Sequence, residues 1–173
     1  VNADAVVILP NNSNIIMAAQ TACGLSETPC AVVPTKSVPQ AFAALFGVDE
    51  GASLEENVES MTEAFAEVKT GEVTRAIKDA KDASGNAIHA GDVIGIADGS
   101  IDAVGQTVEG VVMDLLGAMD AQDADTLTIL AGEDMDDASF EALVARIEEA
   151  YEDLEVDAHR GEQPLYPVVL LVE

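Results

Sequence analysis

The sequence predicts an α/β fold, with an open, mainly parallel sheet flanked by helices and an inserted antiparallel hairpin. The first observation is a set of short apolar runs, such as residues 4–9, between segments whose apolar side chains recur every three or four positions. Runs of this kind are typical of strands that helices cover on both faces. The second observation is a pair of apolar segments, 93–96 and 101–104, on either side of an Asp-Gly dipeptide that favours a tight hairpin turn.

Two strand–helix pairs open the chain. The strand at 4–9 leads through a polar segment into a helix that Gly24 is expected to end. A strand at 30–34 then leads into a short helix, which begins with a predicted capping box of Ser37 and Gln40. The apolar positions of this helix, followed by Gly47, are Phe42, Leu45 and Phe46.

A longer amphipathic helix follows. Ser53 is expected to cap it, with Glu56 three positions later, and Gly71 is expected to end it. Its acidic side chains lie mostly away from the apolar stripe, as on a helix with one solvated side. The stripe consists of Leu54, Val58, Met61, Phe65 and Val68.

The remainder predicts further strands and helices around the hairpin. In chain order these are a weak strand at 72–78, a loop at 84–86, the hairpin, a helix at 108–119 capped by Thr107, a strand at 126–130, a helix begun by Asp136 or Asp137, and strands at 154–159 and 166–172. Because no repeat or linker interrupts this order, residues 1–173 are expected to form a single domain. The chain begins without an initiator Met or a signal-peptide pattern, so we expect it to be excised from a longer protein.

The composition narrows the class of function. Of the 173 residues, 49% are hydrophobic but only 3% are aromatic, so we expect a core of Ala, Val, Ile and Leu. The 33 acidic side chains outnumber the 7 Lys and Arg residues and give a net charge of -26. This charge opposes binding to nucleic acids and to anionic lipid, and no apolar run is long enough to span a bilayer. It favours a basic partner or a salty cytoplasm.

The two cysteines, Cys23 and Cys30, are interpreted as small buried thiols. A secreted disulfide scaffold would carry more cysteines, so the sequence favours a reducing, cytoplasmic location. No His or Asp lies near the pair, and we therefore expect no metal site there.

Three polar segments lie where strands meet turns or helices, which is where open α/β sheets bind their ligands. The first is Asn11-Asn12-Ser13-Asn14, between the first strand and its helix. The second is Thr35-Lys36-Ser37, in which the lysine is the only cation before Lys69. The third contains His159, Arg160 and Gln163 around a Gly turn.

Each segment has a structural and a ligand-binding interpretation. The Asn-rich segment fits either a polar turn that caps a helix or a contact to a ligand or partner. Lys36 stands at a helix start, where the dipole disfavours a cation, so it fits either an anion site or an acidic neighbour. The third segment fits either a turn with a packed Tyr166 or a polar cluster.

Signatures of catalysis and of metal binding are missing from the sequence. It contains no Gly-x-Gly-x-x-Gly, Gly-x-Ser-x-Gly, His-Glu-x-x-His or Cys-x-x-Cys motif, and no Gly-rich run precedes Lys36. The acidic cluster at 133–137 lacks the spacing and the Gly of an EF-hand. The residues by themselves therefore indicate no catalytic constellation and no metal site.

Several segments, in their order along the chain, resemble the C-terminal part of DAK2-domain (dihydroxyacetone kinase-like) proteins. The best understood of these are the ATP-binding subunits of bacterial fatty acid kinase. The resemblance covers nearly the whole chain and implies a DegV-like fold. The segments that carry it are 6–16, 32–40, 68–74, 91–96 and 163–167, with Val172-Glu173 at the end.

The resemblance implies a noncatalytic docking domain. In that family an N-terminal helical domain binds ATP and magnesium through clustered aspartates. A separate DegV-family carrier holds the fatty acid whose carboxylate is phosphorylated for phospholipid synthesis, and the C-terminal domain is thought to engage this carrier. This chain has no Asp-Gly-Asp motif, so the resemblance implies that it has no cofactor of its own and that its kinase domain lies elsewhere in the same protein.

Two departures from the family pattern affect the candidate sites. The family usually has Gly-Gly-Gln-Pro-Leu-Tyr-Pro near its end, whereas this chain has Glu162 in place of the second Gly. A turn that needs a positive φ would tolerate Glu poorly. The family's Gly-Gly-Gln-Thr segment, upstream of the first strand, is also missing from this chain.

Two other functions fit the same residues. One is the binding of a small carboxylate or phosphate by the loops around Asn11–Asn14, Thr35–Lys36 and His159. The other is a structural role, in which the domain forms a homodimer or braces the kinase domain. The docking function itself predicts a carrier with a basic face and an association that weakens with salt.

Overall fold

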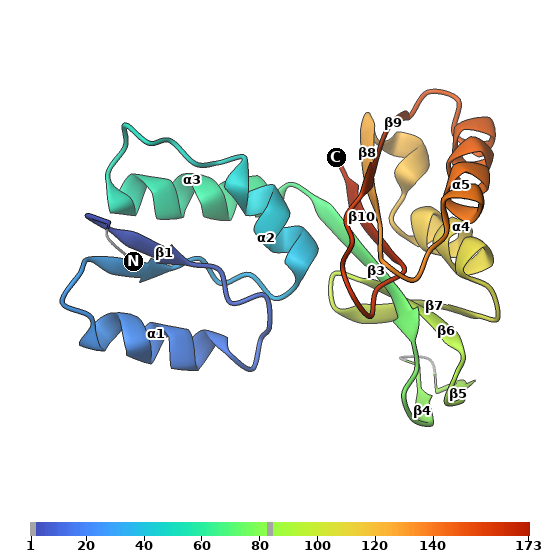
Figure 1. The fold of residues 1–173 in the computed structure, drawn as a ribbon, viewed down its shortest axis with the longest axis horizontal. Helices are drawn as coiled ribbons and strands as arrows, with labels where there is room; N and C mark the ends of the chain where they lie inside the picture. Colours follow the sequence, from blue (N-terminus) through green and yellow to red (C-terminus); the bar gives the residue numbers. More distant parts are fainter. Residues whose placement is uncertain (1–2, 83–84) are drawn as a thin grey trace. The chain divides into compact units, whose positions relative to one another are not determined.

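The computed structural model describes residues 3–82 and 85–173 (Figure 1). The chain forms two compact units, which we call the N-unit (Val1–Val68) and the C-unit (Lys69–Glu173). The predicted span of 1–173 thus contains two structural units, each with its own hydrophobic core. Ser84, in the predicted loop at 84–86, lies outside the described residues.

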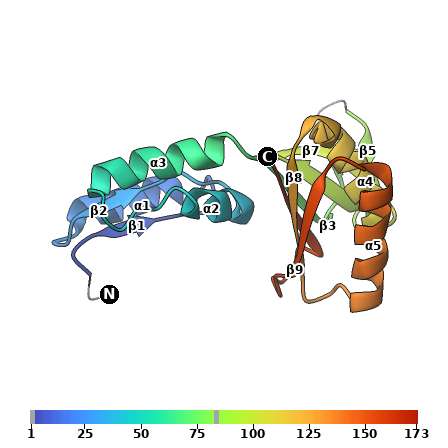
Figure 2. The same ribbon diagram turned by 90° about the horizontal axis from the view of Figure 1, so that it is seen from above.

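The N-unit combines a two-stranded parallel sheet with helices (Figure 2). Strand β1 (Val6–Ile8) pairs with β2 (Cys30–Val32), and helix α1 (Ile16–Leu25) connects them. Helices α2 (Val38–Leu45) and α3 (Leu54–Ala66) follow. Together with half-buried residues of β1 and α3, a small core is formed by Val33, Ala44 and Met61.

The starts of α2 and α3 follow the predicted side-chain caps. At α3 the capping box is complete, since the N–H of Glu56 donates to Ser53 Oγ (3.2 Å) and the N–H of Ser53 donates to Glu56 Oε2 (2.8 Å). At α2 one of the two hydrogen bonds of the capping box forms, in which the N–H of Gln40 donates to Ser37 Oγ (3.3 Å). The Gln40 side chain instead accepts from the N–H of Lys36 (2.8 Å).

In the described residues, the C-unit is built on a six-stranded sheet of order β7-β6-β3-β10-β8-β9. Helices α4 (Val108–Ala118) and α5 (Asp137–Ala150) cover one face of it (Figures 1 and 2). A 3₁₀ turn (Ala121–Asp123) precedes β8, and two short strands, β4 (Ala80–Lys81) and β5 (Ala87–Ile88), pair with each other. The strands of the main sheet are β3 (Lys69–Arg75), β6 (Val93–Ala97), β7 (Ser100–Gly105), β8 (Thr126–Ala131), β9 (Glu155–Arg160) and β10 (Val168–Val172).

The α/β class, the flanking helices and the inserted hairpin are confirmed, but most strand directions in the larger sheet need correction. Strand pairs β1–β2 and β8–β9 are parallel, as predicted. Strand β10 runs antiparallel to both β3 and β8, and β6 runs antiparallel to both β3 and β7. The sheet is therefore mixed rather than mainly parallel. A continuous apolar run indicates burial on both faces, which is most common in parallel sheets. Here the antiparallel strand β10 is also buried along its whole length, so the run does not fix its direction.

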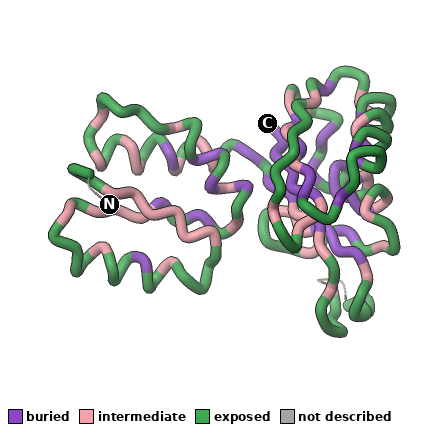
Figure 3. The backbone as a smooth tube through the Cα atoms, in the orientation of Figure 1, coloured by how far each residue is buried: buried purple, intermediate pink, exposed green. Residues whose placement is uncertain are grey.

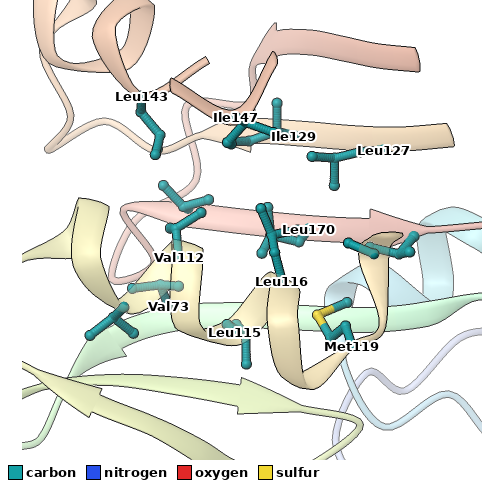
Figure 4. Packing of buried hydrophobic residues seen from close by; sticks show 14 of the residues in the cluster. Val73, Val112, Leu115, Leu116, Met119, Leu127, Ile129, Leu143, Ile147 and Leu170 are labelled. Carbon is teal, nitrogen blue, oxygen red and sulfur yellow. The ribbon is translucent and has the colours of Figure 1, made fainter. Parts of the chain in front are cut away.

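The core of the C-unit lies between the sheet and its two helices (Figure 4). Burial is concentrated in strands β3, β6, β8 and β10 and in the inner sides of α4 and α5 (Figure 3). The packing is largely aliphatic, as the composition predicts, with Phe140 as a buried aromatic. Side chains that pack there include Val73, Val112, Leu115, Leu116, Met119, Leu127, Ile129, Leu143, Ile147 and Leu170.

Two glycines predicted to end helices do not do so. Helix α1 runs through Gly24 to Leu25, and α3 ends at Ala66 rather than at Gly71. Gly71 lies in β3, where a Cβ atom would stand 2.9 Å from Met119 Sδ. A glycine inside a strand often marks such a close approach, so Gly71 allows α4 and the residue after it to pack tightly on the sheet.

Cys23 and Cys30 form a disulfide rather than the predicted free thiols. The end of α1 and the start of β2 bring their Cα atoms to 5.0 Å, a separation that suits this bond. The spacing of the cysteines along the chain does not reveal this proximity, because it depends on how α1 packs against β2. No helix in the described residues combines the length and apolarity that crossing a membrane requires.

Candidate functional site

Two of the predicted polar segments meet at the carboxyl ends of β1 and β2. The N–H of Asn11 donates to Thr35 Oγ1 (3.2 Å), and Thr35 Oγ1 donates to Asn11 Oδ1 (2.9 Å). Thr35 is completely buried, and Asn11 has a φ of 56°, a left-handed conformation that Asn adopts more readily than most residues. Because parallel strands end at the same edge of a sheet, their loops lie together. The Asn11–Thr35 pair therefore anchors a polar surface in the N-unit.

Asn12, Ser13 and Asn14 continue from this pair toward α1 and are exposed. Asn12 Oδ1 accepts from the N–H of Asn14 (2.9 Å), which closes an Asx turn. The N-cap of α1 is Ile15, and no side chain caps this helix. The Asn-rich segment is thus a turn with solvent-facing amides and does not cap the helix.

Lys36 follows the buried Thr35 and precedes α2. Its side chain is exposed, and its ammonium group forms no ion pair with the described residues. The predicted alternative of an acidic neighbour is therefore not observed in that part of the chain. In the sequence Lys36 is also the only Lys or Arg of residues 1–68. The Ser37 side chain caps α2 by accepting a hydrogen bond from the N–H of Gln40.

The third predicted segment lies in the C-unit, where its polar side chains bond to neighbouring residues. Arg160 Nη1 donates to the carbonyl oxygen of Met135 (2.5 Å) and lies 3.5 Å from Asp137 Oδ1. His159 is exposed, with Nε2 2.9 Å from Asp157 Oδ1. These contacts favour the structural interpretation of the segment.

Gln163 fixes the connection between β9 and β10. Its Nε2 donates to the carbonyl oxygens of Leu130 and Tyr166, both at 3.1 Å. Glu162, just before it, has a φ of 54°, so it occupies a left-handed position that glycine would favour. Tyr166 is half-buried, and this burial raises the pKa of its hydroxyl, with the charge of Glu72 adding to the effect.

Helix α2 exposes an apolar surface that we call the α2 face. It consists of Val38, Phe42, Leu45, Phe46 and Val48, whose exposed fractions range from 37% to 68%. The rings of Phe42 and Phe46 meet edge to face, with centroids 5.5 Å apart. The predicted apolar stripe of this helix therefore points into solvent.

Sequence reasoning missed the α2 face because the spacing of Phe42, Leu45 and Phe46 does not show whether that side of the helix is buried or exposed. The buried side of the helix is made of small residues instead: Pro39, Ala41, Ala43 and Ala44. A usable signal was charge, since residues 37–48 contain no charged side chain in a chain of net charge -26.

The N-unit presents groups that can bind a ligand or partner. The Thr35 hydroxyl is hydrogen-bonded to the Asn11 amide, which does not act as a base. Across residues 3–82 and 85–173, no group of three or more His, Cys, Asp and Glu side chains could hold a metal ion. Hydrogen-bonding amides, one ammonium group and an apolar helix face are what this unit offers to a ligand or partner.

Solved structures confirm the DegV-like fold. The fatty acid kinase B3 protein of Streptococcus pneumoniae, solved with linoleic acid, matches with a TM-score of 0.64 and 13% identity, covering 99% of this chain and 74% of that chain. A DegV-family protein of Eubacterium eligens, loaded with heptadecanoic acid, matches with a TM-score of 0.61 and 14% identity, covering 99% and 74%. At these identities the likeness concerns the fold alone.

Sequence comparison places the chain in a family. YloV of Bacillus subtilis (strain 168) is 40% identical over 173 residues, which are 100% of this chain and 31% of YloV. The chain thus spans about a third of the length of this curated relative. The FakA-like C-terminal family, named after the A component of fatty acid kinase, matches all of residues 1–173. The chain therefore belongs to the FakA-like family of fatty acid kinase C-terminal domains.

Proposed function

We propose that this chain is the noncatalytic docking domain of a fatty acid kinase-like protein and that it binds the DegV-family carrier of the fatty acid. The α2 face is the observation that carries the proposal. A contiguous apolar surface of this kind marks an interaction site in a soluble protein. The family membership supports the same function, since it links the chain to one component of a fatty acid kinase.

Phosphoryl transfer, in this proposal, belongs to a kinase domain in another part of a longer protein. The chain matches only 31% of YloV, which leaves room for such a domain in that relative. ATP and magnesium would bind to that kinase domain rather than to this chain. The acyl phosphate would form in the cytoplasm and enter phospholipid synthesis.

In this proposal, burial of the α2 face stabilises the complex with the carrier. The negative charge of the chain determines which partners can bind. Complete burial of an exposed large apolar side chain contributes about 1.5–3 kcal/mol, and Phe42 and Leu45 contribute less than this each because they are already partly buried. Lys36 and the Asn-rich turn lie at the start of α2 and can bond to polar groups at the rim of the contact. A net charge of -26 favours a carrier with a basic face and opposes acidic partners.

Calorimetric titration with the fatty acid-loaded carrier from the same cell tests this function. We expect binding that weakens as salt rises, because salt screens the charges. The double variant Phe42→Ser, Phe46→Ser should bind at least about tenfold more weakly, which corresponds to about 1.4 kcal/mol. Leu25→Ser is the control, since Leu25 is apolar and 82% exposed but lies on α1. Failure of the folded chain to bind the carrier would contradict the proposal.

A second candidate function is the binding of a small carboxylate or phosphate near Lys36. The observation that favours it is an ammonium group, without an ion-pair partner among the described residues, beside the anchored Asn11–Thr35 pair. In a thermal-shift screen, such anions would stabilise the chain, and Lys36→Ala and Asn12→Ala would abolish the effect. A structural role would appear instead as a stable dimer in sedimentation, with no need of the carrier.

A further inference from the structure

A groove of about 650 Å³ lies within the C-unit, between the first turns of α4 and α5 and the end of β3. This volume is in the range of pockets that bind small ligands, about 300–1,000 Å³. None of the site residues predicted from the sequence lines it. Its walls also include the loop before α5 and the loop before β10, which contribute Asp134, Met135, Leu165 and Pro167.

The lining of the groove includes apolar side chains both inside and at the surface. The side chains of Met135 and Leu143 are buried, whereas those of Ile77 and Leu165 are 94% and 75% exposed. In the described part of the C-unit, the exposed large apolar side chains are Ile77, Leu165 and Val104, and only the first two line the groove. Exposed apolar side chains gathered at a groove indicate that it receives an apolar group.

Leu165 is held at the groove by its neighbours. Its φ of 70° is left-handed, a conformation that a leucine disfavours. Thr74 Oγ1 donates to the carbonyl oxygen of Leu165 (2.7 Å), and Gln163 Nε2 donates to that of Tyr166 (3.1 Å). A strained residue persists where the surrounding structure fixes it. The loop therefore presents Leu165 at the groove without any ligand.

The charges at the groove favour a cationic ligand. Three carboxylates, those of Glu109, Asp134 and Asp136, line it together with one guanidinium, that of Arg75. Arg75 Nη1 donates to the carbonyl oxygen of Gly91 (3.3 Å) and keeps its positive charge, and the carboxylate of Glu109 is paired with the guanidinium of Arg146. Three carboxylates thus stand against two guanidinium groups, and the negative charge left over comes from Asp134 and Asp136. A carboxylate or phosphate in the groove would meet like charges, whereas an ammonium or guanidinium group would be attracted.

The two helix starts at the groove do not reverse this preference. At α4, the N–H of Gly110 donates to Thr107 Oγ1 (3.2 Å). At α5, the N–H of Ser139 donates to Asp136 Oδ1 (2.9 Å). Both caps belong to the chain itself, so these N–H groups are not available to an incoming anion.

We propose that this groove binds a short basic segment of a partner protein, with one large apolar side chain packed against Ile77 and Leu165 and with Lys or Arg residues beside the carboxylates. A fatty acid is disfavoured because its carboxylate would face those of the groove. A second copy of this chain is disfavoured because each copy has a net charge of -26. The site lies in the C-unit and does not depend on carrier docking at the α2 face.

The test is an NMR titration of the isotope-labelled 173-residue chain with a short peptide of glycine and lysine that has one central leucine. We expect the amide signals of Ser139 and Ala142, which line the groove, to shift. A peptide with serine in place of leucine should bind about tenfold more weakly, as expected when a leucine side chain is no longer buried. Equal affinity of the two peptides would overturn the proposal.

Variants of the chain sharpen the test. Leu165→Asn removes the apolar side chain and suits the left-handed backbone at this position. Ile77→Ser removes the other exposed apolar side chain, which lies on a different segment of the groove. Both should weaken binding of the leucine peptide about tenfold. Val104→Ser, at an exposed apolar residue outside the groove, should leave it unchanged. Unchanged binding in both groove variants, or preferential binding of laurate or of a glutamate-containing peptide at the same signals, would contradict the proposal.

Discussion

Asn11 and Thr35 bond to each other twice across the ends of β1 and β2, through the N–H and the side-chain oxygen of Asn11. The two residues are 24 positions apart in the chain. Their contact fixes the Asn-rich turn next to Lys36 and the start of α2. A ligand or partner at this edge of the N-unit therefore meets an anchored surface.

The first prediction concerns this pair. Thr35→Val keeps the shape of the side chain but removes its hydroxyl, leaving the Asn11 N–H and Oδ1 without their partner. We expect the free energy of unfolding to fall by about 1–3 kcal/mol. Thr35→Ser keeps the hydroxyl and removes one methyl group, so it should cost only about 1 kcal/mol. Urea denaturation measures both, and an equal loss would show that the hydroxyl contributes nothing.

Gly71 supports a second prediction. A Cβ at this position would approach Met119 Sδ to 2.9 Å and Leu115 Cδ2 to 3.2 Å, so Gly71→Ala should destabilise the C-unit by about 1–3 kcal/mol through overpacking. Gly117→Ala is the matched control. Gly117 lies in α4 with open space around its Cα, and Ala there should stabilise the helix by roughly 0.5–1 kcal/mol. The same sign for both changes in thermal unfolding would refute this explanation of Gly71.

The third prediction concerns the backbone strain at Glu162. Its φ of 54° is strained for any residue with a Cβ, and its carboxylate lies 3.3 Å from Arg160 Nε. Glu162→Ala removes the ion pair but keeps the strain, whereas Glu162→Gly removes both. We expect the Gly variant to be more stable than the Ala variant by about 1 kcal/mol. An Ala variant as stable as the Gly variant would mean that the turn relaxes freely.

The fourth prediction concerns pH. Hydrogen bonds from the backbone N–H and then the hydroxyl of Ser139 lower the pKa of Asp136 below the usual aspartate range. The folded state therefore prefers the carboxylate. Its contribution to stability is complete above the pKa of the unfolded chain and is lost as pH falls through the lower pKa of the folded chain.

Asp136→Asn isolates this contribution, because the amide oxygen can still cap α5 but does not titrate. We expect the difference in Tm between the natural chain and this variant to shrink as pH falls through and below the aspartate range. Comparison of the two proteins cancels the many other carboxylates. A difference that stays constant with pH would show that Asp136 has no special role.

Local features of the fold could be predicted from the sequence, because they depend on neighbours in the chain. The cap at Ser53 needs only Glu56 one turn later, and the hairpin needs only the Asp-Gly turn between two apolar segments. Asn11 and Thr35 could be placed together because parallel strands end at one edge. For this reason the helix starts, the hairpin and part of the candidate site could be predicted from the sequence.

Features that depend on distant parts of the chain could not be predicted. The disulfide needs the end of α1 to meet β2, and the antiparallel direction of β10 depends on where the chain returns between β3 and β8. Phe42 and Phe46 have the same spacing whether their helix face is buried or exposed. The groove around Leu165 is assembled from four segments that lie far apart in the chain, so no pattern within any one of them predicts it.

Titration of the fatty acid-loaded DegV-family carrier into this chain tests the central claim most directly. The account predicts a saturable complex that weakens as salt rises, that is at least about tenfold weaker in the Phe42→Ser, Phe46→Ser variant and that is unchanged in Leu25→Ser. Absence of a complex with the folded natural chain, or equal binding by all three proteins, would contradict docking through the α2 face.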